Sequence, residues 1–533
     1  MFLIWGVYLL ARGLTIDGFN YRLNYLIVCV LFYIACYIIS SKINYIFLFK
    51  GIAFLCGIEN LYCLLQKAGV LSSLNQYFKV TGSWSNPNVT AMFLAMCFPV
   101  LLLMVLETKT WQKKLFLALA FNTILSLVLL KCRSAIIGAG VASVIFLSFK
   151  YGYFKKVKQW KMISKALVIT AILPVLFLLA VIAYHSKKDS ADGRKLIWKL
   201  SAEMIAEKPL GYGYGHFEKE YNLHQAQYFR SGKATDDEFR NVGFVQMAYN
   251  EIFENAVEGG IPGLLLFIGL LVFLLIVPIA RKPTNDINPF FLVNAPYAGI
   301  AAFAIMSVLN FTVQAIPVMA VFILFSAIVS RSSFVELSHL DTVNEALGRV
   351  RAFRLKAVGL GLCIVCLYLG QNILRTSIGQ LKVKTALNLV QEHKYKDAVQ
   401  ILSSLDQLGD SERYLRLYGD ALYRLNDYKG ALIQYNRAKA FTSNPEIYKN
   451  VAACYLHIRN YPAAEQSLFT ALYIEPNSFS TRNALMELYL HAGLKNEAAT
   501  MAQNIISLRP KIPSARVNRY KDKARQVLLK LKI

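Results

Sequence analysis

The sequence predicts an all-α protein made of a polytopic membrane domain followed by an α-solenoid. Of its 533 residues, 56% are hydrophobic and only 17% are charged, and the mean hydropathy is +0.41. A soluble protein carries about 25% charged residues, so this composition excludes a purely soluble chain. Aromatic residues reach 13%, which excludes a disordered or collagen-like chain. A helical repeat that begins after Arg375 supplies the second part.

Transmembrane helices account for most of the apolar residues. Crossing about 30 Å of hydrocarbon takes about 20 apolar residues in a helix. The runs that reach or approach this length are Leu23–Ser40, Tyr45–Leu65, Val89–Leu106, Leu115–Leu130, Ser134–Phe149, Leu167–Tyr184, Ile261–Ala280, Leu292–Leu309, Val313–Val329 and Val358–Leu374. Met1–Ala11 is shorter and lacks the charged start and cleavage site of a signal peptide, so we expect a partial or trimmed first helix. The sequence thus predicts about 10–11 transmembrane helices.

Basic residues give the orientation of these helices. Lys and Arg exceed Asp and Glu by 58 − 32 = 26. Many of them occupy four connections, at 109–114, 150–165, 281–282 and 331–356, and alternating the spans places all four on one side. The positive-inside rule makes that side cytoplasmic. We therefore expect a bacterial inner (cytoplasmic) membrane protein with no nucleic-acid partner, whose long loop 185–260 and residues after Arg375 are periplasmic.

A repeat with a constant period follows Arg375. An alanine follows a turn four times, at Ala398, Ala431, Ala464 and Ala498, with spacings of 33, 33 and 34 residues. The pattern resembles the tetratricopeptide repeat, whose period is about 34 residues. Prolines are expected to close the helix pairs, and small residues to let paired helices approach; these are Pro445, Pro476 and Pro510, and Gly419, Ala452 and Ala484.

Two domains follow from these patterns. Residues 1–375 are predicted to form the transmembrane domain, and 376–533 a periplasmic tetratricopeptide repeat domain with four repeats and a terminal helix, Ser514–Leu531. Stacked repeats bury a continuous core and leave a concave surface. We expect this surface to bind a protein partner, and the alternative is a stabilising appendage.

Most signatures of soluble enzymes are missing. The chain has no G-x-x-x-x-G-K-[ST], H-E-x-x-H or G-x-S-x-G sequence. Gly211-Tyr-Gly-Tyr-Gly215 does not follow a strand in a β-α-β unit, so a dinucleotide site is not expected. Cys363 and Cys366 have C-x-x-C spacing but no second pair, and the other cysteines lie mostly in apolar runs. The sequence therefore predicts no metal and no cofactor.

Four short motifs lie at the predicted outer edge of the membrane. They are Gly82-Ser-Trp-Ser-Asn-Pro-Asn88; Lys131-Cys-Arg133-Ser-Ala135; Gly193-Arg194-Lys-Leu-Ile-Trp198 with Pro209-Leu-Gly-Tyr-Gly-Tyr-Gly-His-Phe217; and Tyr249-Asn250 with Glu258-Gly-Gly-Ile-Pro-Gly263. Structural explanations exist for each. Asn86 can cap a helix that begins at Pro87, and Asn250 and Glu258 can close a loop onto the next span. An arginine in the tight turn at Arg133 is costly unless it meets water, phosphate or an acid.

In this order, the motifs resemble those of the O-antigen ligase and O-antigen polymerase superfamily, over about Gly82 to Val329. The family pattern runs G-x-x-x-N-P-N, S-R-[SG]-A, G-R-x-x-x-W with P-x-x-G-x-G-x-x-F, and H-N with E-x-G-x-x-G. The resemblance implies a fold of the membrane-embedded glycosyltransferase type. It also implies transfer of a glycan from an undecaprenyl-diphosphate carrier at the periplasmic face, by an inverting and metal-independent mechanism.

The resemblance implies roles for individual residues. Arg133 and Arg194 match the two arginine motifs and are expected to be catalytic or to bind the carrier. Cleavage between the anomeric carbon and the diphosphate leaves a multiply charged anion, which guanidinium groups stabilise through bidentate contacts. Tyr249 stands where the family has His; a phenol with a pKa near 10 is a poor base but can donate a hydrogen bond to phosphate. His216 is the first substitute for that His, with His224 and Glu258 as further alternatives. The other motif residues expected to bind substrate are Asn86, Asn88, Trp198, Tyr214, Asn250 and Glu258.

The acceptor stays open. The implied chemistry fits a lipid A-core acceptor (a ligase in lipopolysaccharide biosynthesis), a growing glycan (a polymerase of cell-envelope polysaccharide), or Ser or Thr of an exported protein (O-glycosylation). The rival function is a lipid-linked glycan flippase or transporter. Such a protein would carry several ionisable residues within its spans, and these spans are nearly free of charge. A scaffold that merely anchors the repeats would need far fewer spans.

Overall fold

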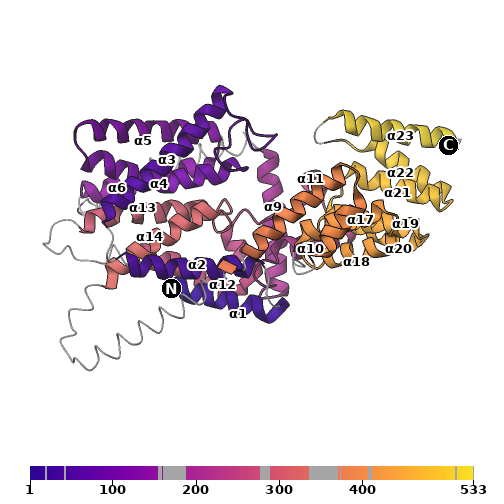
Figure 1. The fold of residues 1–533 in the computed structure, drawn as a ribbon, viewed down its shortest axis with the longest axis horizontal. Helices are drawn as coiled ribbons and strands as arrows, with labels where there is room; N and C mark the ends of the chain where they lie inside the picture. Colours follow the sequence, from indigo (N-terminus) through magenta and orange to yellow (C-terminus); the bar gives the residue numbers. More distant parts are fainter. Residues whose placement is uncertain are drawn as a thin grey trace.

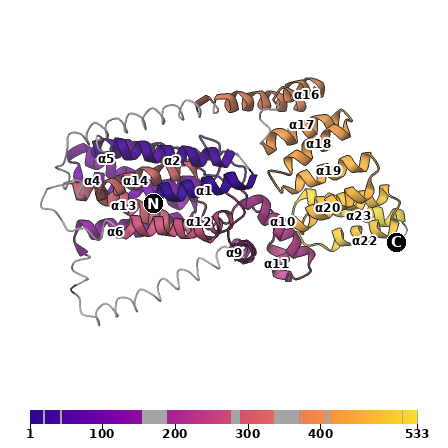
Figure 2. The same ribbon diagram turned by 90° about the horizontal axis from the view of Figure 1, so that it is seen from below.

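A computed structural model of the chain describes residues 1–17, 21–40, 44–153, 159, 188–276, 289–334, 370–371, 374–405, 411–510 and 513–531. Over these residues the protein is all helical, with helices joined by turns and loops and without strands, as the sequence predicts. A bundle of long apolar helices forms one part, and a curved array of short helices forms the other (Figure 1). Three helices, α9, α10 and α11, lie between them (Figure 2).

The bundle has a helix over each predicted span that falls on described residues. Six of its helices are long and apolar enough to cross a membrane. These are α2 (Tyr21–Ile39), α3 (Tyr45–Ala68), α4 (Pro87–Glu107), α5 (Thr110–Leu130), α6 (Arg133–Lys150) and α12 (Glu251–Ile276). The further apolar helices are α1 (Phe2–Asp17), α13 (Pro289–Ser307) and α14 (Ile316–Phe334). The span predicted at 167–184 lies outside the described residues, as does nearly all of the span predicted at 358–374.

Two helices start or end differently from the sequence prediction. The first helix, expected over Met1–Ala11, continues to Asp17 and packs against α12 and α2. The helix α12 begins at Glu251, ten residues before the predicted start at Ile261, because a helical segment precedes the kink at Gly260. Residues 251–259 therefore belong to a buried helix rather than to an open loop.

The helix α4 forms the centre of the bundle. In its apolar span 83% of the residues are buried, compared with 22–33% in the other five long spans. It contacts α3, α5, α6, α13 and α14, and its low amphipathicity fits a helix that is surrounded on all sides. Pro87 lies in its first turn, where a missing N–H costs nothing, and Asn86 accepts a hydrogen bond from the Asn88 N–H at 3.0 Å.

The two ends of the bundle carry different residues. Lys150 at the end of α6 lies 3.5 Å from Glu107 at the end of α4, and Arg331 near the end of α14 donates to the carbonyl of Tyr37 near the end of α2. The opposite end holds the starts of α2, α4, α6, α12 and α14. The four sequence motifs all reach this second end, which we call the motif end.

The helices between bundle and solenoid have a core of their own. They are α9 (Lys188–Glu207), α10 (Phe217–Arg230) and α11 (Asp236–Asn241). Leu196, Leu200, Phe217 and Tyr221 are among the side chains buried there. The short α11 starts with a capping box, in which the side chains of Thr235 and Glu238 each accept a hydrogen bond from the backbone N–H of the other residue. These helices extend the motif end away from the bundle (Figure 2).

Helix pairs build the solenoid, as the repeat predicts. The first pair comprises helical residues 374–391 and α16 (Tyr395–Ser403). The others are α17 (Glu412–Arg424) with α18 (Tyr428–Ala438), α19 (Pro445–His457) with α20 (Tyr461–Ile474), and α21 (Phe479–His491) with α22 (Lys495–Ser507); α23 (Ala515–Leu531) follows. The four alanines Ala398, Ala431, Ala464 and Ala498 are all fully buried. One detail differs, because Pro445 opens α19 rather than closing the preceding pair.

Candidate functional site

Arg194 and Arg133 come together at the motif end. Arg194, on α9, donates from Nη1 to the carbonyl of Leu309 in the α13–α14 loop at 2.9 Å. Burial lowers the pKa of Arg194, and the neighbouring charge of Arg133, the first residue of α6, lowers it further. Two guanidinium groups that repel each other at a helix N-terminus form a natural place for an anion. Among the described residues, Arg194 forms no ion pair.

The α13–α14 loop holds this arrangement in place. Asn310 donates from Nδ2 to Ser134 Oγ at 3.1 Å, and its side chain also contacts Cys132 Sγ at 3.7 Å. The two neighbours of Arg133 are therefore bound to the loop that accepts from Arg194. Asn310 follows an apolar span without any motif around it, so the sequence offered no signal for it.

Tyr249 packs against Arg194. The guanidinium carbon of Arg194 lies 5.0 Å from the centroid of the Tyr249 ring, and Phe311 meets the same ring edge-on at 6.0 Å. Tyr249 adopts the left-handed backbone region with φ 53°, which is uncommon for a non-glycine residue. Burial raises the pKa of Tyr249, against the lowering effect of Arg194. Its phenol stays protonated near neutral pH, so this residue offers a ring face and a hydroxyl rather than a base.

Three glutamates form a second, buried cluster on α12. Glu251, Glu254 and Glu258 follow the spacing i, i+3, i+7 and so share one face of the helix. They surround a cavity of about 10 Å³, large enough for one water. Its other lining residues are Arg22, Tyr214, Asn255, Val313 and Gln314. We call this set the carboxylate cluster.

Each glutamate ties a different loop to α12. Glu251 accepts from the backbone N–H of Val313 at 2.7 Å, Glu254 from that of Ala248 at 3.0 Å, and Glu258 from that of Phe217 at 3.2 Å. Gln314 also donates to Glu254, and Arg22 donates to Gln314 at 3.3 Å. Sequence reasoning found only Glu258 and Tyr214 of this cluster. The E-x-x-E-x-x-x-E spacing at the start of an apolar helix was the available signal.

The glycine-rich turn Gly211–Gly215 docks on the kink of α12. Tyr212 N–H donates to the carbonyl of Val257 at 2.8 Å, and Gly213 N–H to that of Glu258 at 2.9 Å. A Cβ on Gly211 would lie 2.4 Å from the Gly260 nitrogen, so the two backbones touch. His216 follows in the same turn, is 9% exposed, and precedes α10.

Other predicted substrate-binding residues have structural partners. Asn86 caps α4, and Asn250 caps α12 by accepting from the Ile252 N–H at 2.9 Å, which confirms the capping explanation for both. Trp198 donates to the carbonyl of Ala248 at 3.0 Å and stacks on Phe253. Asn88 is half-buried in the first turn of α4.

Two predicted features connect elsewhere. The segment around Gly82 is bound to α3, where Gln66 accepts from the Gly82 N–H at 2.9 Å and Glu59 from the Ser83 N–H at 3.1 Å. His224, on α10, lies 3.5 Å from both Glu203 and Glu207 of α9. It therefore helps join these two helices.

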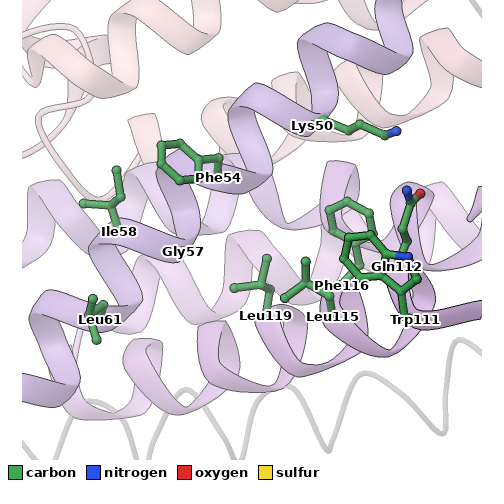
Figure 3. A pocket seen from close by; sticks show the side chains of 10 residues that line it. All are labelled: Lys50, Phe54, Gly57, Ile58, Leu61, Trp111, Gln112, Leu115, Phe116 and Leu119. Atoms are coloured by element: carbon green, nitrogen blue, oxygen red, sulfur yellow. The ribbon is translucent and has the colours of Figure 1, made fainter.

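A larger pocket lies elsewhere, between α3 and α5. Its volume is about 430 Å³, and Figure 3 shows Phe54, Leu61, Leu115 and Leu119 among its lining side chains. The lining is apolar apart from Lys50 and Gln112, and it contains none of the motif residues. Convergent polar groups mark binding sites, so the candidate site is the motif end rather than this pocket. Among the described residues no group of three or more His, Cys, Asp or Glu is placed to hold a metal, and Cys363 and Cys366 lie outside those residues.

Known proteins match this chain in two ways. Among solved structures, the "MamA RS-1 ArsTM double mutant" is 16% identical over 29% of this chain and 92% of that chain, with a TM-score of 0.24. Yeast Tom70 is 14% identical over 84% of this chain and 90% of that chain, with a TM-score of 0.25. Similarities this low do not define a fold. The solenoid is established by the helix pairs described above. Residues 115–268, which include Arg133, Arg194, Tyr249 and the carboxylate cluster's three glutamates, match the family model described as O-antigen ligase. Residues 115–268 of this chain are thus similar to the O-antigen ligase family.

Proposed function

We propose that this protein transfers a glycan from undecaprenyl diphosphate to an acceptor at the periplasmic face of the bacterial inner membrane. The apolar helices and the match of residues 115–268 to the O-antigen ligase family support a membrane enzyme of the glycosyltransferase type that uses a lipid-linked glycan. The carrier, the face of the membrane and the metal-independent, inverting chemistry are the finer steps of the proposal.

The observation that carries the proposal is the meeting of Arg133 and Arg194. Both are half-buried and both lie at the motif end. They are close enough that the charge of Arg133 lowers the pKa of Arg194. The leaving diphosphate gains negative charge as its bond to the anomeric carbon breaks. Fixed cations at that place stabilise the transition state more than the ground state. The ring of Tyr249 and the carbonyl of Leu309 fix the position of the Arg194 side chain before the carrier binds.

The solenoid enters the proposal as the part that meets the acceptor or an assembly partner. It lies beyond the motif end, on the same side of the bundle as α9, the helix that carries Arg194 (Figure 2). An acceptor that binds there can reach the carrier without crossing the bilayer. The acceptor can be a lipid A-core, a growing glycan or a protein hydroxyl, and the experiment below distinguishes these three.

Reconstitution tests the function. The purified protein in liposomes is given undecaprenyl-diphosphate-linked glycan and, in turn, lipid A-core, free glycan and an exported protein with Ser and Thr. We expect one acceptor to gain the glycan while the carrier is released as undecaprenyl diphosphate. Translocation of intact lipid-linked glycan without carrier release would contradict the proposal and favour a flippase.

Thiol labelling tests the orientation. Gly232→Cys, beyond α10, and Gln503→Cys, on α22, are exposed sites, and the parent chain is the background because its described cysteines are buried or half-buried. Both should react with a membrane-impermeant maleimide in spheroplasts. Lys113→Cys, exposed on α5 at the opposite end, is the matched control and should react only after lysis. The reverse pattern would place the motif end in the cytoplasm.

A further inference from the structure

The solenoid makes a packed contact with α10 of the long loop. Ala226 of α10, Tyr448 of α19, and Ala471 and Ile474 of α20 form a small core that is buried between them. Leu223 and Phe244 of the loop pack around it. The solenoid is therefore docked on α10 of the long loop (Figure 2).

Polar contacts fix the register of this contact. The Glu218 carboxylate, in the first turn of α10, accepts from Thr442 Oγ1 at 2.9 Å, from the Ser443 N–H at 3.0 Å and from Ser443 Oγ at 3.1 Å. Thr442 and Ser443 are 2% and 0% exposed, so water does not compete for these donors. Gln225 adds a hydrogen bond to the carbonyl of Ile474 at 2.8 Å. Charge-assisted bonds in a buried place are the strong ones.

The membrane domain also binds the same turn of α10. Phe217, the neighbour of Glu218, donates its N–H to Glu258 of the carboxylate cluster at 3.2 Å. Two residues earlier, Gly215 packs so closely on Arg22 that a Cβ there would lie 2.8 Å from the Arg22 side chain. Adjacent residues of one helical turn thus hold the solenoid and the cluster. A shift of this turn moves both contacts, because a helical turn is rigid at that scale.

We propose that Glu218 is a positioning residue through which docking of the solenoid sets the geometry of the carboxylate cluster. Thr442 and Ser443 hold Glu218, and this fixes the N–H of Phe217 against Glu258. The solenoid then acts on the transfer step itself, in addition to binding an acceptor or partner. This consequence for transfer rests on the proposed function, whereas the coupling between the two contacts does not.

Coupling of this kind is reciprocal. If docking strengthens the Phe217–Glu258 contact, then weakening that contact loosens the docking by the same factor. The two contacts can be observed separately, because the Ser443 N–H reports docking and the Phe217 N–H reports the cluster. Amide hydrogen exchange of the full-length protein in lipid nanodiscs measures both.

The first variant pair opens the docking contact. Thr442→Ala with Ser443→Ala removes two hydroxyl donors to Glu218, and we expect exchange at Ser443 and at Phe217 to rise together, about 10- to 100-fold. Thr442→Ser, which keeps a hydroxyl, should leave both protected. Thr500→Ala, an exposed site on α22 whose hydroxyl only meets its own helix, is the matched control. Faster exchange at Ser443 alone, or at neither amide, would overturn the proposal.

The reciprocal variant approaches from the cluster. Glu258→Gln weakens the acceptor for the Phe217 N–H, and exchange at Ser443, the solenoid residue bound to Glu218, should rise as well. Unchanged exchange at Ser443 alongside faster exchange at Phe217 would show that the contacts are independent, which would also overturn the proposal. The hydroxyl variants keep the test decisive if this one fails to fold.

Kinetics separate the coupling from the function. In liposomes with undecaprenyl-diphosphate-linked glycan, the Thr442→Ala/Ser443→Ala protein should lose at least about 5-fold in kcat, because the carboxylate cluster is misplaced. The KM for the donor should change less, because the variant leaves Arg133 and Arg194, the proposed contacts of the carrier, in place. A rise in the KM of the acceptor alone would assign the solenoid to binding only and contradict the proposal. If the unaltered protein consumes no lipid-linked glycan, the proposed function fails, and the exchange measurements still decide the coupling.

Discussion

Replacing Arg194 with Ala should lower the rate of glycan transfer about 10²- to 10³-fold, the usual effect of removing one donor to a developing anion. The guanidinium is the group that the structure brings beside Arg133, and Arg133→Ala should have an effect of the same order. The loss should fall mainly on kcat, because the diphosphate proposed as the leaving group gains its additional negative charge as the bond breaks. Transfer by purified protein in liposomes, at saturating lipid-linked glycan, measures it.

Lysine and a neighbouring cation supply the controls. Arg194→Lys should recover only part of the activity, since an ammonium keeps the charge but loses the planar fork and the stacking on Tyr249. Lys195→Ala removes a cation from the adjacent position of α9, which is 65% exposed, and should leave transfer unchanged. Arg194→Ala also loses the bond to Leu309, so the thermal midpoints of all variants must be matched. Activity close to that of the parent in both alanine variants would assign the arginines to anchoring.

The helices of the bundle were predictable because lipid leaves the backbone few choices. Inside hydrocarbon every N–H and C=O must be paired within the segment, so long apolar runs become helices. The start of α4 was predictable as well, because Asn86 caps it just before Pro87. The start of α12 was not, because it begins at Glu251, ten residues before the predicted span. The solenoid was predictable for a different reason. One alanine per repeat, such as Ala431, must fit between two helices, and this leaves a constant period in the sequence.

The candidate site was only partly predictable. The arginine motifs led to Arg133 and Arg194, but the partners that hold Arg194 come from distant parts of the chain. The Leu309 carbonyl is 115 residues away from it in sequence. The carboxylate cluster shows the same limit, because Arg22 meets Gln314 across 292 residues. Contacts between elements leave no periodicity in either one. The spacing of Glu251, Glu254 and Glu258 is visible in the sequence, but their partners and the docking of Glu218 on Ser443 have no sequence signature.

Alanine at Gly211 or Gly260 should disrupt the motif end, through two effects that add. Both glycines have a positive φ, 80° and 68°, and such a conformation costs an L residue about 1–3 kcal/mol. In addition, a Cβ on Gly260 would lie 2.4 Å from the carbonyl carbon of Leu210, and one on Gly211 as close to the Gly260 nitrogen. Both atoms belong to the backbone and cannot rotate away, and overpacking of this kind costs about 1–3 kcal/mol more. We expect a loss of about 2–6 kcal/mol in stability.

Other glycines of the same loop separate the two effects. Gly243 has open space and an ordinary φ, so Gly243→Ala should change stability by less than about 0.5 kcal/mol. Gly232 has open space but a φ of 72°, so Gly232→Ala should show the conformational cost alone. Thermal midpoints in one detergent should therefore fall in the order Gly243→Ala, Gly232→Ala, and then Gly211→Ala with Gly260→Ala. Only the last two should expose the amides of Tyr212 and Gly213 to exchange, because their hydrogen bonds to Val257 and Glu258 need the two backbones in contact. Equal midpoints for Gly232→Ala and Gly211→Ala would mean that the turn and the kink of α12 do not touch, and the path from α10 to Glu258 would lose its support.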